Sequence, residues 1–180
     1  VLRSNAVVLE TAHLQQTLWS LMTLITDDVR RAGYWSRAEL ALDGSAVNRY
    51  APIHVLDGDC LLYSYDEQRD DADGAPDPED HQGFRLSGAG LQLKTSDETC
   101  AGTTCADCGS GTWWLMNDAQ GIRVTALSFT LTEHARPFDG AGRELVAREV
   151  GIRLEGEIAS DPSVHQSLTG RVSVRNHEIR

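Results

Sequence analysis

The stretch TLWSLMTLITDDVRRAGYWSR, residues 17–37, decides how the fold begins. Its apolar residues recur every three, four or seven positions and continue a pattern that reaches back to about Leu2, which is typical of one face of an α-helix. Gly33 supplies a C-terminal stop. We therefore expect a helix from about Leu2 to Tyr34. At 1.5 Å per residue this helix is about 45–50 Å long, so one end should project beyond a compact domain.

Strand patterns follow this helix. Asp57-Gly58 and Ser87-Gly88 are turn signals between short apolar runs, and later segments alternate between apolar and polar residues. This alternation covers residues 122–132, 146–158 and 168–174. A phase slip after Ala126 predicts a β-bulge. One helix followed by about eight strands, without a βαβ rhythm, predicts the α+β class, with a long N-terminal helix packed on antiparallel β-sheet.

The size and charge of the chain limit its organisation and partners. Its 180 residues fit one domain, in which we expect residues 1–35 to form the helix and residues 36–180 a β-rich globular head. The net charge of -11 argues against a nucleic-acid partner, because binding a phosphate backbone needs clustered Lys and Arg. The same charge argues against docking on anionic lipid.

An acidic loop, residues 66–82, contains a dense group of carboxylates. Aligned on Gly74, the loop does not match an EF-hand, because Arg69 stands at the first ligand position. A looser calcium site remains an alternative to a solvated loop, since a hard cation relieves repulsion between carboxylates. Its candidate ligands are Asp66, Asp70, Asp71, Asp73 and Asp77.

A second loop, residues 95–111, holds three of the four cysteines. An even count within Gly/Thr/Ser-rich sequence predicts disulfides in an oxidising compartment. The cysteines are Cys60, Cys100, Cys105 and Cys108, and their spacing leaves all three pairings open. A zinc site is less well supported, because paired C-x2-C knuckles are missing. Trp113 and Trp114 follow, and in a strand one of them should face the core and the other the solvent.

The sequence lacks the motifs of the common catalytic sites. It has neither a Gly-rich phosphate loop nor a nucleophile elbow, and no two histidines have the zincin spacing. We therefore predict a protein that is not an enzyme and has no cofactor other than the calcium considered above. There is no apolar run of about 18 residues and no signal peptide. Because the chain starts at Val1 within a helical pattern, we expect residues to be missing upstream.

Four short motifs occur along the chain in an order that matches a known family. DDVRRAGYW ends the helix, GDCLLYSYD and GFRL follow in the first strands, and VSVRN lies near the end of the chain. Together they resemble the PilW family of type IV pilus minor pilins over nearly the whole chain. More distantly, the layout is similar to the J-type minor pseudopilin of type II secretion.

The resemblance implies a pilin-like fold and a structural subunit. In that family, an apolar helix that follows a class III prepilin leader anchors the protein in the inner membrane, with the head in the periplasm, before it enters the pilus at the surface of a Gram-negative cell. The implied partners are other minor pilins, the major pilin and a tip adhesin. The implied function is to prime pilus assembly. Assembled pili in turn support twitching motility and cell adhesion.

The N-terminal stripe of the helix is the expected contact with these partners. We expect Leu2, Val7, Val8 and Leu14 to form this interface, and later helix residues to pack on the domain's own sheet. Two other functions stay open: a J-type pseudopilin, and a periplasmic calcium- or ligand-binding module that uses the acidic loop.

Overall fold

The computed structural model describes residues 2–68, 74–100 and 102–180, with side chains from Val8 onward. The long helix is α1 (Leu2–Val29), and two short turns of helix follow it, α2 (Glu39–Leu42) and the 3-10 turn η1 (Pro78–Asp80). The strands of the described residues are β1 (His54–Leu56), β2 (Cys60–Ser64), β3 (His81–Ser87), β4 (Gly90–Ser96), β5 (Thr112–Leu115), β6 (Ile122–Pro137), β7 (Glu144–Ile158), β8 (Asp161–Ser173) and β9 (Glu178–Ile179).

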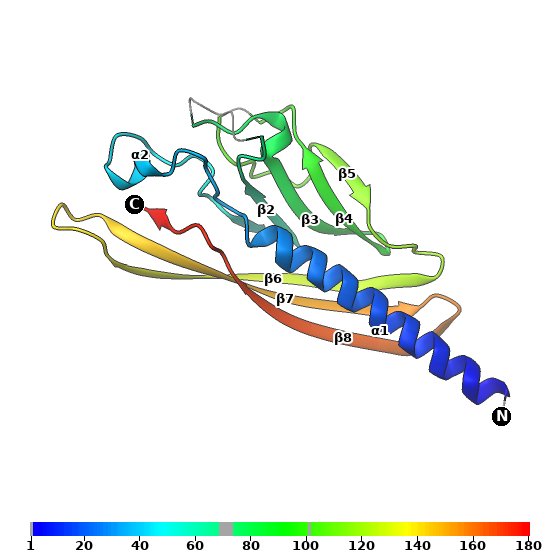
Figure 1. The fold of residues 1–180 in the computed structure, drawn as a ribbon. Helices are drawn as coiled ribbons and strands as arrows, with labels where there is room; N and C mark the ends of the chain where they lie inside the picture. Colours follow the sequence, from blue (N-terminus) through cyan, green and yellow to red (C-terminus); the bar gives the residue numbers. More distant parts are fainter. Residues whose placement is uncertain (1, 69–73, 101) are drawn as a thin grey trace.

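The strands form two antiparallel sheets (Figure 1). The first sheet has the order β1-β2-β3-β4-β5, and the second has the order β6-β7-β8, with β9 paired to β7. Asp57 and Gly58, both with positive φ, form the tight turn between β1 and β2, as the sequence predicts. The two sheets meet where the Phe129 N–H donates to the Gly58 carbonyl at 2.7 Å.

The second sheet has one apolar and one polar face. Along β7, buried residues alternate with more exposed ones from Val146 to Ile158, because successive side chains of a strand point to opposite faces. The register of β6 against β7 shifts between Val124 and Ala126, which confirms the predicted bulge. The bulge turns Leu127 and Phe129 toward the core, so β6 keeps its apolar face inward.

Helix α1 lies along the apolar face of the second sheet, against β7 and β8 (Figure 1). Two glycines allow this close approach. A Cβ on Gly156 would lie 2.9 Å from Leu18 Cδ2, and one on Gly170 would lie 2.9 Å from Met22 Sδ. The N-terminal turns of α1 extend past the turn between β7 and β8 (Figure 1). Among the described residues, no helix has the length and apolar character needed to cross a membrane.

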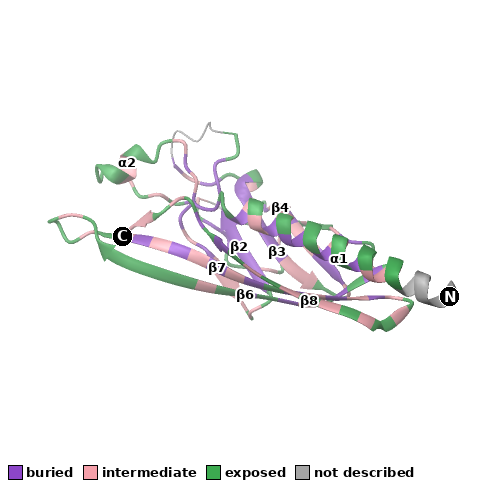
Figure 2. Cartoon of the chain, turned by 60° about the horizontal axis from the view of Figure 1, so that its bottom comes forward, coloured by how far each residue is buried: buried purple, intermediate pink, exposed green. Residues whose placement is uncertain are grey.

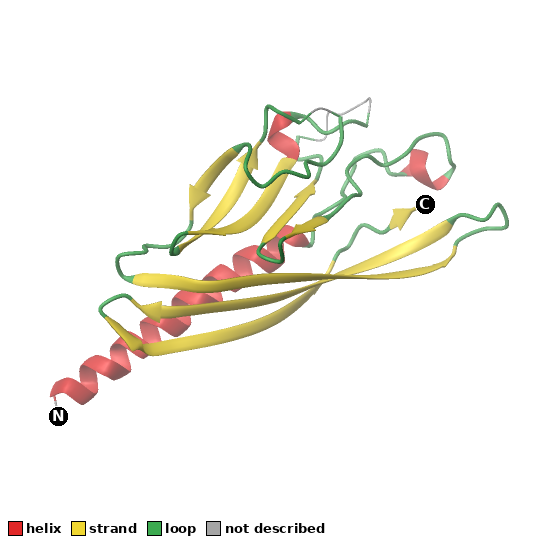
Figure 3. Cartoon of the chain, turned by 180° about the vertical axis from the view of Figure 1, so that it is seen from behind, coloured by secondary structure: helices red, strands yellow, loops and turns green. Residues whose placement is uncertain are grey.

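The main core joins α1 with the inner faces of both sheets. Its buried members include Leu18 and Ile25 from the helix, Phe84 from β3 and Ile152 from β7. Figure 2 shows this buried layer between the helix and the strands. Seen from behind, the second sheet lies in front of the helix, so its outer, polar face is not covered by α1 (Figure 3).

The predicted α+β class is wrong, because the protein is mostly β: strands account for 43% of residues and helices for 17%. Two strands of the second sheet are longer than the sequence patterns indicate, with 16 residues in β6 and 13 in β8, whereas β7 extends the predicted stretch by only two residues. The last six residues of β6 are all exposed, and the first half of β8 has no buried residue, so apolar alternation fades there and the sequence pattern shows only part of each strand. The helix also ends earlier than expected, at Val29.

The close contact between helix and sheet predicts that alanine substitutions at two glycines of β7 differ in their effect on stability. Gly156→Ala should lower the free energy of unfolding by about 1–3 kcal/mol, because the new methyl group would collide with Leu18 and with the Arg123 carbonyl, 3.0 Å away. Gly151→Ala is the matched control, since its Cβ would meet only Thr130 at 3.7 Å. Urea unfolding of the two variants measures the difference, and equal stabilities would contradict this packing.

Candidate functional site

The outer face of α1 is the first candidate for a functional surface. Val8 is 64% exposed and Trp19 is 53% exposed. Eleven residues of helix bring them to within about 20° of each other around the axis, so they share one face. Leu9, also exposed, lies beside this face. The surface formed by Val8, Leu9 and Trp19 is named the helix patch below.

The structure places the predicted interface residues in different environments. Val8 is exposed as an interface requires, and it belongs to the helix patch. The side chains of Leu2 and Val7 lie outside the described residues. Leu14 is fully buried in the core of its own domain, so it is not available to a neighbouring subunit. The stripe read from the sequence includes Leu14 because helical periodicity alone does not distinguish an intramolecular contact from an intermolecular one.

The C-terminal end of α1 is a second structured region, which we call the helix-end junction. Asp28 accepts hydrogen bonds from the hydroxyls of Tyr63 and Tyr65 on and just after β2, and it pairs with Arg31. Burial and the charge of Asp28 raise the pKa of Tyr63 well above its usual value, so this hydroxyl keeps its proton and donates to Asp28. The contact therefore ties the last helical turn to β2 of the first sheet.

The chain after β8 satisfies the carbonyl groups at this helix end. Asn176 Nδ2 donates to the carbonyls of Arg31 at 3.1 Å and Ala32 at 3.2 Å, and the Arg175 N–H donates to the Arg30 carbonyl. Carbonyl groups at a helix C-terminus have no partner within the helix, so an outside donor stabilises them. Gly33 then turns the chain with a φ of +75°, four residues after α1 ends at Val29.

The helix-end junction brings together three of the pieces that carry the PilW resemblance. DDVRRAGYW contributes Asp28 and Gly33, GDCLLYSYD contributes Tyr63, and VSVRN contributes Asn176. The Gly33 N–H donates to the Ser64 carbonyl at 2.8 Å, which links the first two pieces directly. GFRL adds Phe84, whose ring lies 6.4 Å from that of Tyr63. These motifs therefore build the connection between the helix and the head.

Two disulfides close the cysteine loop. Cys60 of β2 is bonded to Cys108, and Cys100 is bonded to Cys105. The predicted disulfides are confirmed, and the structure selects one of the three pairings that the sequence leaves open. Trp113 packs half-buried beside this loop, while Trp114 is 61% exposed, in line with the prediction for the pair.

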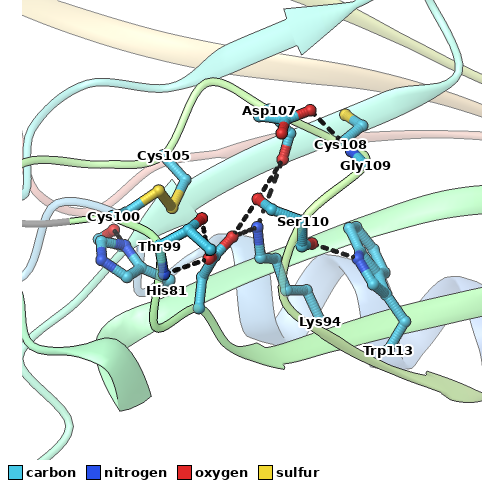
Figure 4. A network of polar contacts seen from close by, with 12 residues as sticks. His81, Lys94, Thr99, Cys100, Cys105, Asp107, Cys108, Gly109, Ser110 and Trp113 are labelled. Carbon is cyan, nitrogen blue, oxygen red and sulfur yellow. Dashed lines mark hydrogen bonds and ion pairs between the residues drawn. A yellow bond between two sulfur atoms is a disulfide. The ribbon is translucent and has the colours of Figure 1, made fainter.

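A fully buried ion pair supports the loop (Figure 4). Lys94 Nζ of β4 lies 2.5 Å from Asp97 Oδ2, and Asp97 also accepts bonds from Ser110 and Thr99. Burial disfavours the charged form of Asp97, but the bonds from Lys94, Ser110 and Thr99 outweigh it and hold the pKa of this carboxyl well below its usual range. The sequence alone does not reveal this pair, because a single Lys within a strand pattern gives no indication that its side chain is buried.

His81, the first residue of β3, has a buried side chain. Its Nδ1 lies 3.1 Å from Ser64 Oγ, and its Nε2 has no hydrogen-bond partner among the described residues. Burial, and after it the charge of Lys94, lowers the pKa of His81, so the ring is neutral. The ring lies beside the Cys100–Cys105 disulfide (Figure 4).

The acidic loop is only partly described. Asp70, Asp71 and Asp73 lie outside the described residues. Asp66 accepts a hydrogen bond from the Ser36 N–H at 3.0 Å, and Asp77 caps η1. These two predicted calcium ligands therefore make contacts within the protein, and calcium binding stays a prediction.

Comparison with protein families places this chain among the type IV pilin-associated proteins. Within that class it belongs to the family of prepilin peptidase-dependent protein B (PpdB), whose model matches residues 8–174. The match covers α1 from Val8 and the strands from β1 to β8, and it ends just before Arg175 and Asn176 of the helix-end junction. It does not show the narrower assignment to PilW. Searches of curated proteins and of solved structures gave no match.

The helix-end junction predicts a large difference between two adjacent carboxylates. Asp28→Ala should lower the free energy of unfolding by about 2–3 kcal/mol, because it leaves the buried Tyr63 hydroxyl without an acceptor. Asp27→Ala is the control, since Asp27 is 62% exposed and pairs only with the exposed Arg30. That change should cost less than about 0.5 kcal/mol in chemical denaturation. Similar losses for both variants would show that the junction does not depend on Asp28.

The Lys94–Asp97 pair predicts a dependence of stability on pH. The pKa of Asp97 is depressed in the folded protein, so its contribution is present above the unfolded value of about 3.9 and is lost as the pH falls toward the lower folded value. In Asp97→Asn, this part of the acid dependence should disappear from unfolding curves recorded across the acid range.

At neutral pH, Asp97→Asn should itself cost about 3–5 kcal/mol, because Lys94 would be buried without its ion-pair partner. The double variant Lys94→Met/Asp97→Asn should recover much of that loss, since it removes the unpaired charge. A double variant as unstable as Asp97→Asn would contradict this account.

Proposed function

We propose that the protein is a minor pilin that works through contacts between subunits and catalyses no reaction. The observation that carries the proposal is the match to the prepilin peptidase-dependent protein B family over residues 8–174. The name of that family points to a precursor cut by prepilin peptidase. We accordingly propose that a leader and an apolar anchor precede this segment and hold the protein in the inner membrane, with the head in the periplasm.

The helix patch is the proposed contact with other subunits. Its three side chains are apolar and exposed, whereas the opposite side of α1 is buried in the domain. An exposed apolar stripe on a helix suits a groove between neighbouring helices, and a large aromatic such as Trp19 is a common centre of binding energy. The proposed partners are other minor pilins, the major pilin and a tip adhesin. The proposed role, in the manner of PilW, is to prime pilus assembly and thereby support twitching and adhesion.

The two disulfides suit this location, because such bonds form and persist in the periplasm and at the cell surface. They also suit a head that would be carried outside the cell in a filament. The proposed role needs no cofactor, since it rests on packing between subunits.

A charge placed in the helix patch tests the proposed contact. Trp19→Glu should leave the melting temperature nearly unchanged, because Trp19 is outside the core, but it should strongly reduce piliation when the gene is returned to a deletion strain. Val47→Glu is the matched control, since Val47 is 76% exposed but lies outside α1, and it should restore piliation fully. Wild-type piliation with a folded Trp19→Glu variant would exclude the helix patch as an assembly contact.

The deletion strain also separates the two related functions. Loss of pili and of twitching, with normal secretion, is the expected result for a minor pilin. Loss of exoprotein secretion with normal pili would instead identify a J-type pseudopilin.

A further inference from the structure

The corner where His81 meets the cysteine loop contains three soft or borderline ligands. The atoms are a ring nitrogen of His81, Cys100 Sγ and Cys105 Sγ, and all of them lie within 4.8 Å of one another. Ligands of a tetrahedral zinc ion lie roughly 3.5–3.8 Å apart, given bonds of about 2.0–2.3 Å. Shifts of about one ångström would therefore place all three on one ion.

His81 is oriented as a metal ligand requires. The ring is 1% exposed, and Nε2 is without a hydrogen-bond partner among the described residues while Nδ1 contacts Ser64 Oγ. With the proton on Nδ1, the N–H donates a hydrogen bond to Ser64 Oγ, and the lone pair of Nε2 is left without a hydrogen-bond partner among the described residues. Hydrogen bonding of the second nitrogen in this way fixes the ring of many zinc-binding histidines.

We propose that reduction of the Cys100–Cys105 disulfide converts this corner into a Zn²⁺ site formed by His81, Cys100 and Cys105. A dithiol supplies two electrons and two protons to the disulfide and is itself oxidised to a disulfide. Zn²⁺ then displaces the two thiol protons and binds both thiolates and Nε2, and water completes the tetrahedron. Two thiolates balance the charge of the ion, so the bound site is neutral in its partly buried setting.

The rest of the loop does not depend on this disulfide for its position. The Lys94–Asp97 pair holds its base, and Asp97 accepts bonds from Thr99, the residue before Cys100. The Cα atoms of Cys100 and Cys105 are 5.7 Å apart, a separation that two ligands of one ion can keep. The loop can therefore hold either a disulfide or a metal ion. This chemistry is independent of the proposed role in the pilus.

Cobalt binding tests the site. The full chain is reduced with a dithiol, which is then removed under argon, and Co²⁺ is added as a spectroscopic probe. We expect one Co²⁺ per chain, a thiolate-to-cobalt absorption band in the near ultraviolet, and loss of this band when Zn²⁺ is added. The oxidised protein should give no such band. Absence of the band in the reduced protein would overturn the proposal.

Variants identify the ligands. His81→Ala should weaken Zn²⁺ binding by at least about tenfold, and Cys100→Ser/Cys105→Ser should abolish the thiolate band. His13→Ala is the control for loss of a histidine, because His13 is an exposed residue of α1, and it should bind like the wild type. Equal affinities of His81→Ala and the wild type would exclude His81 as a ligand and overturn the proposal.

Alkylation gives a readout on the wild-type chain that does not require the variants to fold. In the reduced protein, Zn²⁺ should slow alkylation of Cys100 and Cys105, as mapped by mass spectrometry, and leave the alkylation rates of Cys60 and Cys108 unchanged. Equal protection of all four cysteines, or of none, would overturn the proposal even if reduction loosens the fold.

Discussion

The end of α1 is the point on which the rest of the structure depends. There a buried carboxylate, Asp28, meets two tyrosine hydroxyls from the first sheet, and Asn176 satisfies carbonyl groups that the helix leaves without partners. Buried polar groups of this kind are costly when one partner is missing and stabilising when all are paired. The junction therefore fixes the direction of the helix relative to both sheets.

This arrangement gives the two sides of α1 different roles. Glycines in β7 and β8 let the inner side of α1 approach the second sheet closely. The inner side of the helix is therefore buried in the domain's own core. The outer side carries Val8, Leu9 and Trp19, and the N-terminal turns reach beyond the strands (Figure 1). A subunit built in this way can offer its helix to neighbours while its head stays folded, which is the physical basis of the proposed pilus role.

Much of the secondary structure is readable from local patterns, but the fold class is not. Helical periodicity, the turn at Gly33, the Asp57-Gly58 turn and the bulge near Ala126 are local properties, and each is visible in the sequence. The full lengths of β6 and β8 are not, because the exposed end of β6 and the first half of β8 lack apolar alternation. The sequence therefore understates the strands, and the α+β prediction follows from that error.

By itself, the sequence determined that the chain has an amphipathic helix, alternating strands, four cysteines fit for disulfides, and the four motifs of its pilin resemblance. Only the tertiary structure decided the disulfide pairing, the burial of Lys94 and His81, and the difference between Leu14, which is inside, and Val8, which is outside. Each of these depends on segments that are distant in the chain and adjacent in space. Periodicity reports which side of an element is apolar, whereas packing decides what covers it.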